Sequence, residues 1–186
     1  ITQPGAVTDA AGVASGVFTS TVSEAKTTSA VAAGVAITQT QVITVVPDDA
    51  SATQSTVAVS AASIVAGAAT TTVTVTARDG NGNPVSGASV VIAATGAGNS
   101  ITQPAATTDA NGVATGTLSS TVAGDKLVSA TVNGVTVTQT QTVTVTPAAL
   151  SADSSSVVAA PGTISADGGA STVTITARDG FGNVLA

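Results

Sequence analysis

The feature that most constrains this chain is an internal repeat with a period of 100 residues. When residue n is aligned with residue n+100, residues 1–86 match residues 101–186 without a gap, and 43 of the 86 pairs are identical. The identical residues fall in blocks, such as TARDG at 76–80 and again at 176–180. Self-similarity at a fixed period indicates a repeat architecture, in which each unit packs mainly against its neighbours.

Two prolines at equivalent positions mark the expected boundaries of the repeat. Pro47 and Pro147 each follow a long run of alternating residues and precede a short irregular stretch. Proline has no backbone N–H to give to a strand ladder, so it suits a strand end or a linker. We therefore expect residues 47–147 to form one complete repeat. Residues 1–46 would then be the C-terminal half of a preceding repeat, and residues 148–186 the N-terminal part of a further one.

The alternation of side chains predicts an all-β fold. The chain is rich in Thr and Val, and β-branched residues fit a pleated sheet better than a helix. Apolar and small polar residues alternate in several runs that we predict to be strands, at residues 72–77, 89–94, 113–118, 128–132 and 135–145. Asn133-Gly134 between two of these runs predicts a type I′ hairpin. Short strands separated by such turns predict tandem immunoglobulin-like β-sandwich repeats of about 100 residues.

Two glutamines do not fit a simple alternation in the last of these runs. By parity, Gln139 and Gln141 share a face with Val137 and Val143, which are expected in the core. The glutamines are either buried and hydrogen-bonded, or re-aimed by a bulge or a change of sheet. We favour the second alternative, because an unsatisfied buried amide costs on the order of 1–3 kcal/mol.

The order and spacing of these motifs resemble a known family. The run TVTVTARDGNGN at 72–83 is followed by PVSGASV at 84–90, TDANGVATGTL at 108–118 and SATVNG at 129–134. Together they are similar to the group 1 bacterial immunoglobulin-like domain (Big-1), which occurs in intimin- and invasin-type adhesins and in other large bacterial surface proteins. The resemblance implies an extracellular location at the bacterial cell surface, and a stalk that holds a separate binding tip away from the cell.

Composition excludes several classes of function. The chain has no His and no Cys, which removes the usual catalytic triads, thiol nucleophiles and most zinc sites, so we expect no enzyme activity. Four basic residues against ten acidic ones cannot form a phosphate-binding patch, so nucleic acid is not an expected partner. No apolar run is long enough to insert into a membrane.

One polar cluster is a candidate calcium site. Oxygen-bearing side chains alternate with glycines from residue 79 to residue 83, as in the first half of a calcium loop, but no Glu follows at the expected spacing. The alternative is a plain turn, since Asx and Gly are common turn residues. In a sandwich this loop, the 109–112 turn and the 133–134 hairpin would lie at one pole, which faces the preceding domain and the 47–49 linker. The candidate ligands for Ca²⁺ are Asp48, Asp49, Asp79, Asn81, Asn83 and Asp109. We expect no other cofactor.

The single lysine in each copy of the repeat is a candidate for a covalent cross-link. Some surface-protein sandwiches join a buried Lys to Asn through an isopeptide bond. Lys126 follows Gly124-Asp125 in a turn-like context, however, so we expect Lys126 and its equivalent Lys26 to be exposed.

These observations favour a non-catalytic stalk or fibre segment whose partners are neighbouring identical repeats, with adhesion to host or other cells through regions outside the segment. An alternative is a subunit of an extracellular filament, in which the partial repeats at the ends complete one another between chains. A second alternative is a ligand- or carbohydrate-binding module. Sugar-binding platforms normally use flat aromatic faces, and this chain has only Phe18 and Phe181.

Overall fold

The computed structural model describes residues 1–5 and 7–185, and the regular structure in this part of the chain is entirely β-strand. In these residues no helix has the length and apolar character needed to cross a membrane. The strands of the two end segments are β1 (Ala25–Thr28), β2 (Val31–Ala32), β3 (Val35–Ala36), β4 (Gln41–Thr44), β14 (Ser156–Ala160) and β15 (Thr172–Thr176). The strands between them are β5 (Thr56–Val59), β6 (Ser63–Val65), β7 (Thr71–Thr76), β8 (Val90–Ala94), β9 (Asn99–Thr102), β10 (Val113–Ser120), β11 (Gly124–Val132), β12 (Val135–Thr136) and β13 (Gln141–Thr146).

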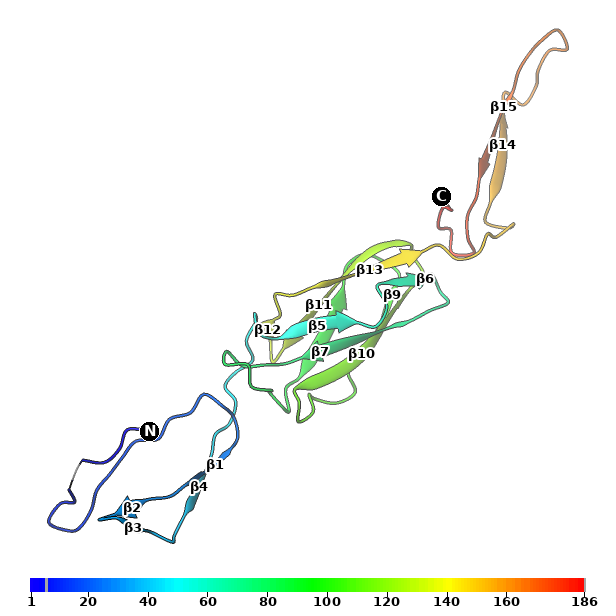
Figure 1. The fold of residues 1–186 in the computed structure, drawn as a ribbon. Coiled ribbons are helices and arrows are strands. Elements are labelled where there is room, and N and C mark those ends of the chain that lie inside the picture. The colour runs from blue at the N-terminus through cyan, green and yellow to red at the C-terminus, as the bar shows by residue number, and fades with distance from the viewer. Residues whose placement is uncertain (6, 186) are drawn as a thin grey trace.

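Strands β5 to β13 form a sandwich of two sheets at the centre of an elongated molecule (Figure 1). One sheet has the strand order β5-β7-β10-β9, and all of its pairs are antiparallel. In the other sheet β11 pairs with β8, β12 and β13, and β13 pairs in parallel with β6. This is the all-β immunoglobulin-like architecture that the alternating sequence predicts.

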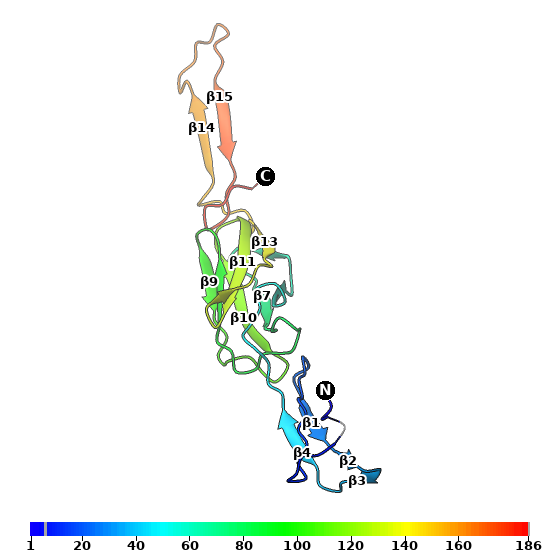
Figure 2. The same cartoon turned by 90° about the vertical axis from the view of Figure 1, so that its left-hand side faces the viewer.

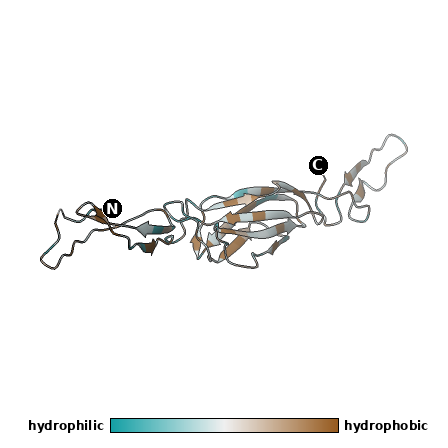
Figure 3. Ribbon diagram, turned by 60° about the horizontal axis from the view of Figure 1, so that its bottom comes forward, coloured by the Kyte–Doolittle hydropathy of each residue, from teal (hydrophilic) through white to brown (hydrophobic). Residues whose placement is uncertain are grey.

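The core lies between the two sheets and is built from small apolar side chains. It contains 19 buried residues, all between Ala50 and Val145. Strand β7 shows why the alternation works, because Val73 and Val75 are fully buried while the Thr side chains between and beside them are not. Figure 3 shows the hydrophobic residues on the strands of the sandwich.

The two end segments are open and lie beyond opposite ends of the sandwich (Figures 1 and 2). In the N-terminal segment β1 pairs with β4 and β2 with β3, and in the C-terminal segment β14 pairs with β15. None of these sheets has more than two strands in the described part of the chain. Their apolar side chains are consequently exposed, including Val31, Val42, Val157 and Ile175.

The last strand of the sandwich differs from the prediction. The single strand expected over residues 135–145 is wrong: it is divided into β12 and β13. Thr136 pairs with Thr131 and Gln141 with Val128, so four residues of the returning chain lie opposite two residues of β11. This insertion is what re-aims the first glutamine.

The re-aiming predicted for the two glutamines is confirmed for Gln139 but not for Gln141, which shares a face of β13 with the buried Val143. Thr138 donates its backbone N–H to the carbonyl of Ala52 (2.9 Å), and the Gln139 side-chain oxygen accepts the N–H of Val57 at the start of β5 (3.3 Å). Gln139 is exposed and Gln141 is half-buried, while Val137 and Val143 are in the core. The predicted type I′ hairpin is also confirmed, because Asn133 and Gly134 both have positive φ (48° and 83°).

Candidate functional site

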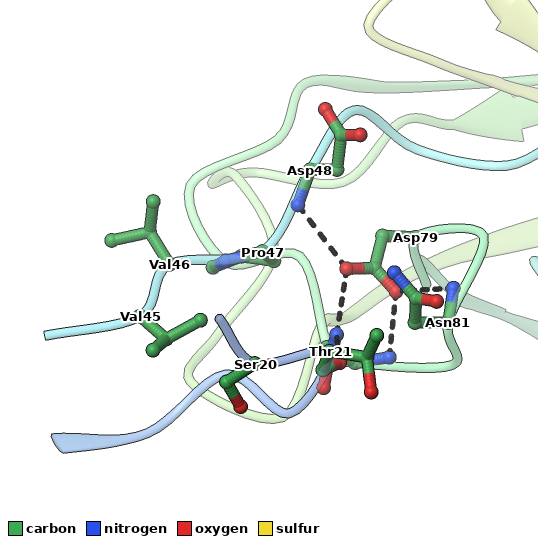
Figure 4. A pocket seen from close by; sticks show the side chains of 9 residues that line it. Ser20, Thr21, Val45, Val46, Pro47, Asp48, Asp79 and Asn81 are labelled. Atoms are coloured by element: carbon green, nitrogen blue, oxygen red, sulfur yellow. Dashed lines mark hydrogen bonds between the residues drawn. The ribbon is translucent and has the colours of Figure 1, made fainter. Parts of the chain in front are cut away.

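The carboxylate of Asp79, in the loop that follows β7, is a buried and densely hydrogen-bonded polar group. Its side chain is 1% exposed. Oδ1 accepts the backbone N–H groups of Asn81 (2.9 Å) and Asn83 (2.8 Å). Oδ2 accepts the backbone N–H of Asp48 (3.1 Å) and the side-chain amide of Asn83 (2.8 Å), as Figure 4 shows for the residues around it. Four donors therefore converge on one buried carboxylate.

The local sequence explains why the loop takes this shape. An Asp side chain readily accepts N–H groups two and four residues ahead, which closes an Asx-type turn. Gly82 has a φ of 86°, a conformation in which a side chain would be strained. The guanidinium of Arg78 donates to the Gly82 carbonyl (2.7 Å), and this bond fixes the far side of the turn.

Asn83 connects this loop to the N-terminal segment. Its side-chain oxygen accepts the backbone N–H of Ser23 (2.9 Å), and its amide nitrogen donates to the carbonyl of Thr21 (2.9 Å). The same amide nitrogen donates to Asp79, so one side chain joins the loop and a segment 60 residues away in sequence. A cleft of about 330 Å³ lies at this contact, between the loop, Pro47 and Ser20. We call the pair Asp79 and Asn83, with the backbone groups that they bind, the junction latch.

The latch recurs at the same offset as the sequence repeat. The Asp179 carboxylate accepts the backbone N–H of Ala148 (2.9 Å) and the side-chain amide of Asn183 (2.7 Å). Asn183 in turn donates to the Thr121 carbonyl (2.9 Å) and accepts the N–H of Ala123 (2.8 Å). Each contact of the first latch has an equivalent 100 positions further on in the second, because the Asp and the Asn recur with the repeat.

The neighbouring side chains differ between the two latches without changing these bonds. Ala148 stands where the first latch has Asp48, and Phe181 stands where it has Asn81. Both positions contribute only their backbone N–H groups. An ideal Cβ placed on Gly67 would lie 2.1 Å from the ring of Phe181, so the ring lies directly against the backbone at Gly67.

The electrostatics of both carboxylates follow from their donors. Burial by itself raises the pKa of the Asp79 carboxyl, but the hydrogen bonds from Asn83, Asp48 and Asn81 outweigh burial and leave the pKa below its ordinary value of 3.8. The same balance lowers the pKa of Asp179 to about 2. Both groups are therefore held in the charged form that the latch requires.

The residues predicted to bind calcium lie in different environments. Asp79 and Asn83 face N–H donors in the latch, whereas Asn81 is exposed and contributes its backbone N–H. The exposed Asp48 carboxylate accepts the N–H of the exposed Asp49 (2.9 Å). In the turn before β10, Asp109 accepts two N–H groups of its own turn.

This arrangement favours a structural role for the loop. Within residues 1–5 and 7–185, no three His, Cys, Asp or Glu side chains are grouped so that they could hold a metal ion. Amide donors around Asp79 stabilise its negative charge in the way that a cation would. The shared calcium site stays a prediction that a binding experiment must test.

The expectation that Lys126 is exposed is wrong. Its side chain is 3% exposed, and its Nζ donates to the carbonyl of Ala97 (2.9 Å). The residue lies in β11 rather than in a turn, and the turn-like Gly124-Asp125 pair begins that strand. Lys26, its equivalent in the N-terminal segment, pairs with Glu24.

Sequence reasoning missed half of the latch. It identified Asp79 and Asn83 as polar residues at the pole that faces the linker, but it did not identify their partners near Thr21 and Ser23. Those partners are backbone groups, which carry no residue signal. The one available signal is the recurrence of Asp and Asn, four residues apart, in both copies of the repeat.

Comparison with known proteins places these features in a family. The family model of invasin, domain 3, matches residues 51–148. No curated protein sequence matches the chain.

Several solved structures are similar to this chain, among them three bacterial proteins. The adhesin FdeC of Escherichia coli is 29% identical, with a TM-score of 0.58 over 81% of this chain and 48% of that one. Invasin, a bacterial integrin-binding protein, is 26% identical, with a TM-score of 0.63 over 96% of this chain and 36% of that one. InvD of Yersinia pseudotuberculosis is 24% identical and shares the fold, with a TM-score of 0.65 over 99% and 59% of the two chains. The chain spans less than two thirds of the length of each.

Proposed function

This chain belongs to the invasin domain 3 family, and from that premise we propose that it is a non-catalytic stalk segment of a bacterial surface adhesin. Residues 47–147 would form one domain of the stalk. Residues 1–46 and 148–186 would belong to the domains before and after it. The stalk would be extracellular and would keep adhesive regions, located elsewhere, at a distance from the cell surface.

The observation that carries this proposal is the recurrence of the latch at an offset of 100 residues. A stalk keeps its adhesive regions at a distance from the cell only if its domains resist bending about their linkers. In both latches a buried carboxylate holds the linker backbone, and the neighbouring Asn holds the segment that precedes it. A linker of one proline and a few residues, bonded on both sides, bends less than a free linker of the same length.

The relatives support the surface role. FdeC is described as an adhesin, and invasin as an integrin-binding protein. The buried carboxylates of the two latches accept backbone N–H groups, which supports a structural role for them. We therefore assign the binding of host or other cells to regions outside this segment.

The stiffness of the first junction can be measured by spin labelling, because the chain has no cysteine. Thr44→Cys and Thr142→Cys place one label in β4 and the other in β13, both at exposed positions. Double electron–electron resonance on the 186-residue chain then gives the distribution of distances across the junction. We expect a single narrow distribution for the otherwise unchanged chain.

Two substitutions in the loop that follows β7 show whether the latch sets the width of this distance distribution. Asn83→Ala removes both bonds to the N-terminal segment, and we expect the distribution to widen at least twofold. Asn81→Ala removes a side chain that makes no hydrogen bond within the described residues, and we expect no change in width. If Asn83→Ala leaves the width unchanged, the latch does not stiffen the junction and the stalk proposal loses its main support.

A further inference from the structure

The loop of the second latch carries one of the two aromatic residues of the chain. Phe181 stands where the first latch has Asn81, and each donates its backbone N–H to the latch carboxylate (2.9 Å in both). The two side chains therefore leave loops of the same backbone shape. In the complete central repeat Asn81 is exposed and lines the cleft toward the preceding segment. A side chain at this position thus faces the preceding repeat even where its own sandwich is complete.

The ring of Phe181 lies on the central sandwich at Gly67, in the turn between β6 and β7. An ideal Cβ on Gly67 would lie 2.1 Å from the ring Cζ and 2.3 Å from Cε2, so a side chain here would displace the ring. Glycine permits such a close approach, and the turn also gives it a positive φ of 67°. The C-terminal partial repeat has Asp167 at the equivalent position, so the bare backbone is a property of the central repeat and not of every copy.

The ring and the latch attach the same loop to two neighbouring parts of the sandwich. Gly67, under the ring, donates its N–H to the carbonyl of Ser120 (2.9 Å). Asn183 of the latch donates to the carbonyl of the next residue, Thr121 (2.9 Å). A loop held at Thr121 alone can tilt about that attachment, whereas a ring that rests on Gly67 beside it resists the tilt. Phe181 therefore adds a restraint that the hydrogen bonds of the latch do not supply.

We infer that the backbone at Gly67 is a docking site for an aromatic side chain of the following repeat, and that Phe181 occupies it. The ring is 52% exposed, so about half of its surface is removed from water, and burial of aromatic surface stabilises the contact. An Asn at this position, as in the central repeat, would bury far less apolar surface there. The docking site thus distinguishes between repeats that share the latch, and it makes their order along the chain matter. The inference deepens the stalk proposal, and it rests on that proposal for treating the two sides of the contact as neighbouring domains.

Spin labels across the second junction test the contact. Thr142→Cys in β13 and Thr174→Cys in β15 place the labels at exposed positions, and double electron–electron resonance on the 186-residue chain gives the distribution of distances. Phe181→Asn introduces the residue of the first latch and keeps the backbone N–H, so we expect the distribution to widen by about half. Gly67→Ala should widen it equally, because the new Cβ displaces the ring. The double variant should be no wider than either single variant, since both changes remove the same contact.

Gly87→Ala is the matched control for backbone strain. Gly87 also has a positive φ (73°), but its Cβ would meet no atom of the described residues within 4 Å, so we expect no change in width. If Phe181→Asn or Gly67→Ala leaves the width unchanged, or if Gly87→Ala widens the distribution as much as they do, the docking site is refuted. Asn183→Ala separates this outcome from a failure of the stalk proposal, because it removes only latch bonds at the same junction. Widening by Asn183→Ala without widening by Phe181→Asn would leave the latch standing and overturn the docking site alone, whereas no widening by either would overturn both.

Discussion

Replacing Asp79 by Asn is the most direct test of the latch, since it changes one oxygen into a nitrogen and leaves the shape almost the same. The amide oxygen of the new side chain can still accept the N–H groups of Asn81 and Asn83, as Oδ1 does now. Its NH₂ group would face the N–H of Asp48 and the side-chain amide of Asn83, which now donate to Oδ2. The two hydrogen bonds to the charged Oδ2 are lost. Their donors then face an NH₂ group, which cannot accept them.

The expected loss of stability follows from those two bonds. A hydrogen bond to a charged group contributes about 1.5–3 kcal/mol, and a donor left without an acceptor in a buried site costs about 1–3 kcal/mol. Rotation of the loop relieves part of this, so we expect Asp79→Asn to lower the free energy of unfolding of the central sandwich by about 2–4 kcal/mol. That is a large share of the roughly 5–15 kcal/mol that holds a typical domain folded.

Urea unfolding followed by circular dichroism measures this difference, and Asp109→Asn is the matched control. Asp109 also closes a turn through its side chain, in front of β10, but only its Oδ1 accepts N–H groups, from Asn111 and Val113, and an Asn oxygen can accept both. We expect the control to change the free energy of unfolding by less than about 0.5 kcal/mol. If the two variants unfold at the same urea concentration, the four donors around Asp79 do not stabilise the fold, and the account of the latch is wrong.

Three further outcomes are expected. Because the pKa of Asp79 is lowered in the folded chain, its contribution to stability is present above the ordinary value of 3.8 and is lost as pH falls below 3.8 through the folded value; urea titrations from pH 6 to pH 2 should therefore show a smaller loss for Asp79→Asn than for the unchanged chain. Gly112→Ala should destabilise by about 2–4 kcal/mol, since its Cβ would lie 2.4 Å from the Ala77 carbonyl oxygen at a positive φ, whereas Gly134→Ala meets no atom within 4 Å and should lose only about 1 kcal/mol; equal losses in urea unfolding would contradict this. If the predicted calcium site exists, the melting temperature should be higher in millimolar calcium than in chelator, and equal temperatures would count against it.

Most of the fold could be predicted because its strands and turns depend on residues that are neighbours in the sequence. The alternation of Val and Thr in β7 requires one buried face, and Asn133-Gly134 requires a tight hairpin, so both features follow from a few neighbouring residues. Strands β12 and β13 were predicted as one strand because alternation alone continues through Thr138 and Thr140. The break depends on bonds from this stretch to Ala52 and Val57, which are distant in sequence.

The latch was less predictable for the same reason. The alternating Asp79, Asn81 and Asn83 suggested oxygen ligands around a cation, because a sequence shows side-chain oxygens but not backbone N–H groups. Lys126 illustrates the opposite difficulty. A lysine beside a Gly-Asp pair is normally on the surface, but here Lys126 is buried and its Nζ donates to the carbonyl of Ala97 in the 95–98 loop.

The latch also explains how junctions of different composition keep the same geometry. The linker after Pro47 begins with two acidic residues and the linker after Pro147 with two alanines, yet the bonds to Asp79 and Asp179 are the same. Linker residues bind the Asp carboxylate through their backbone N–H groups, which every residue except proline supplies. The junction therefore depends on two side chains of each repeat, Asp and Asn four positions apart, and on the glycine that lets the loop turn between them. A stalk built in this way would tolerate variation in charge along its linkers, whereas loss of the Asn would free that junction to bend.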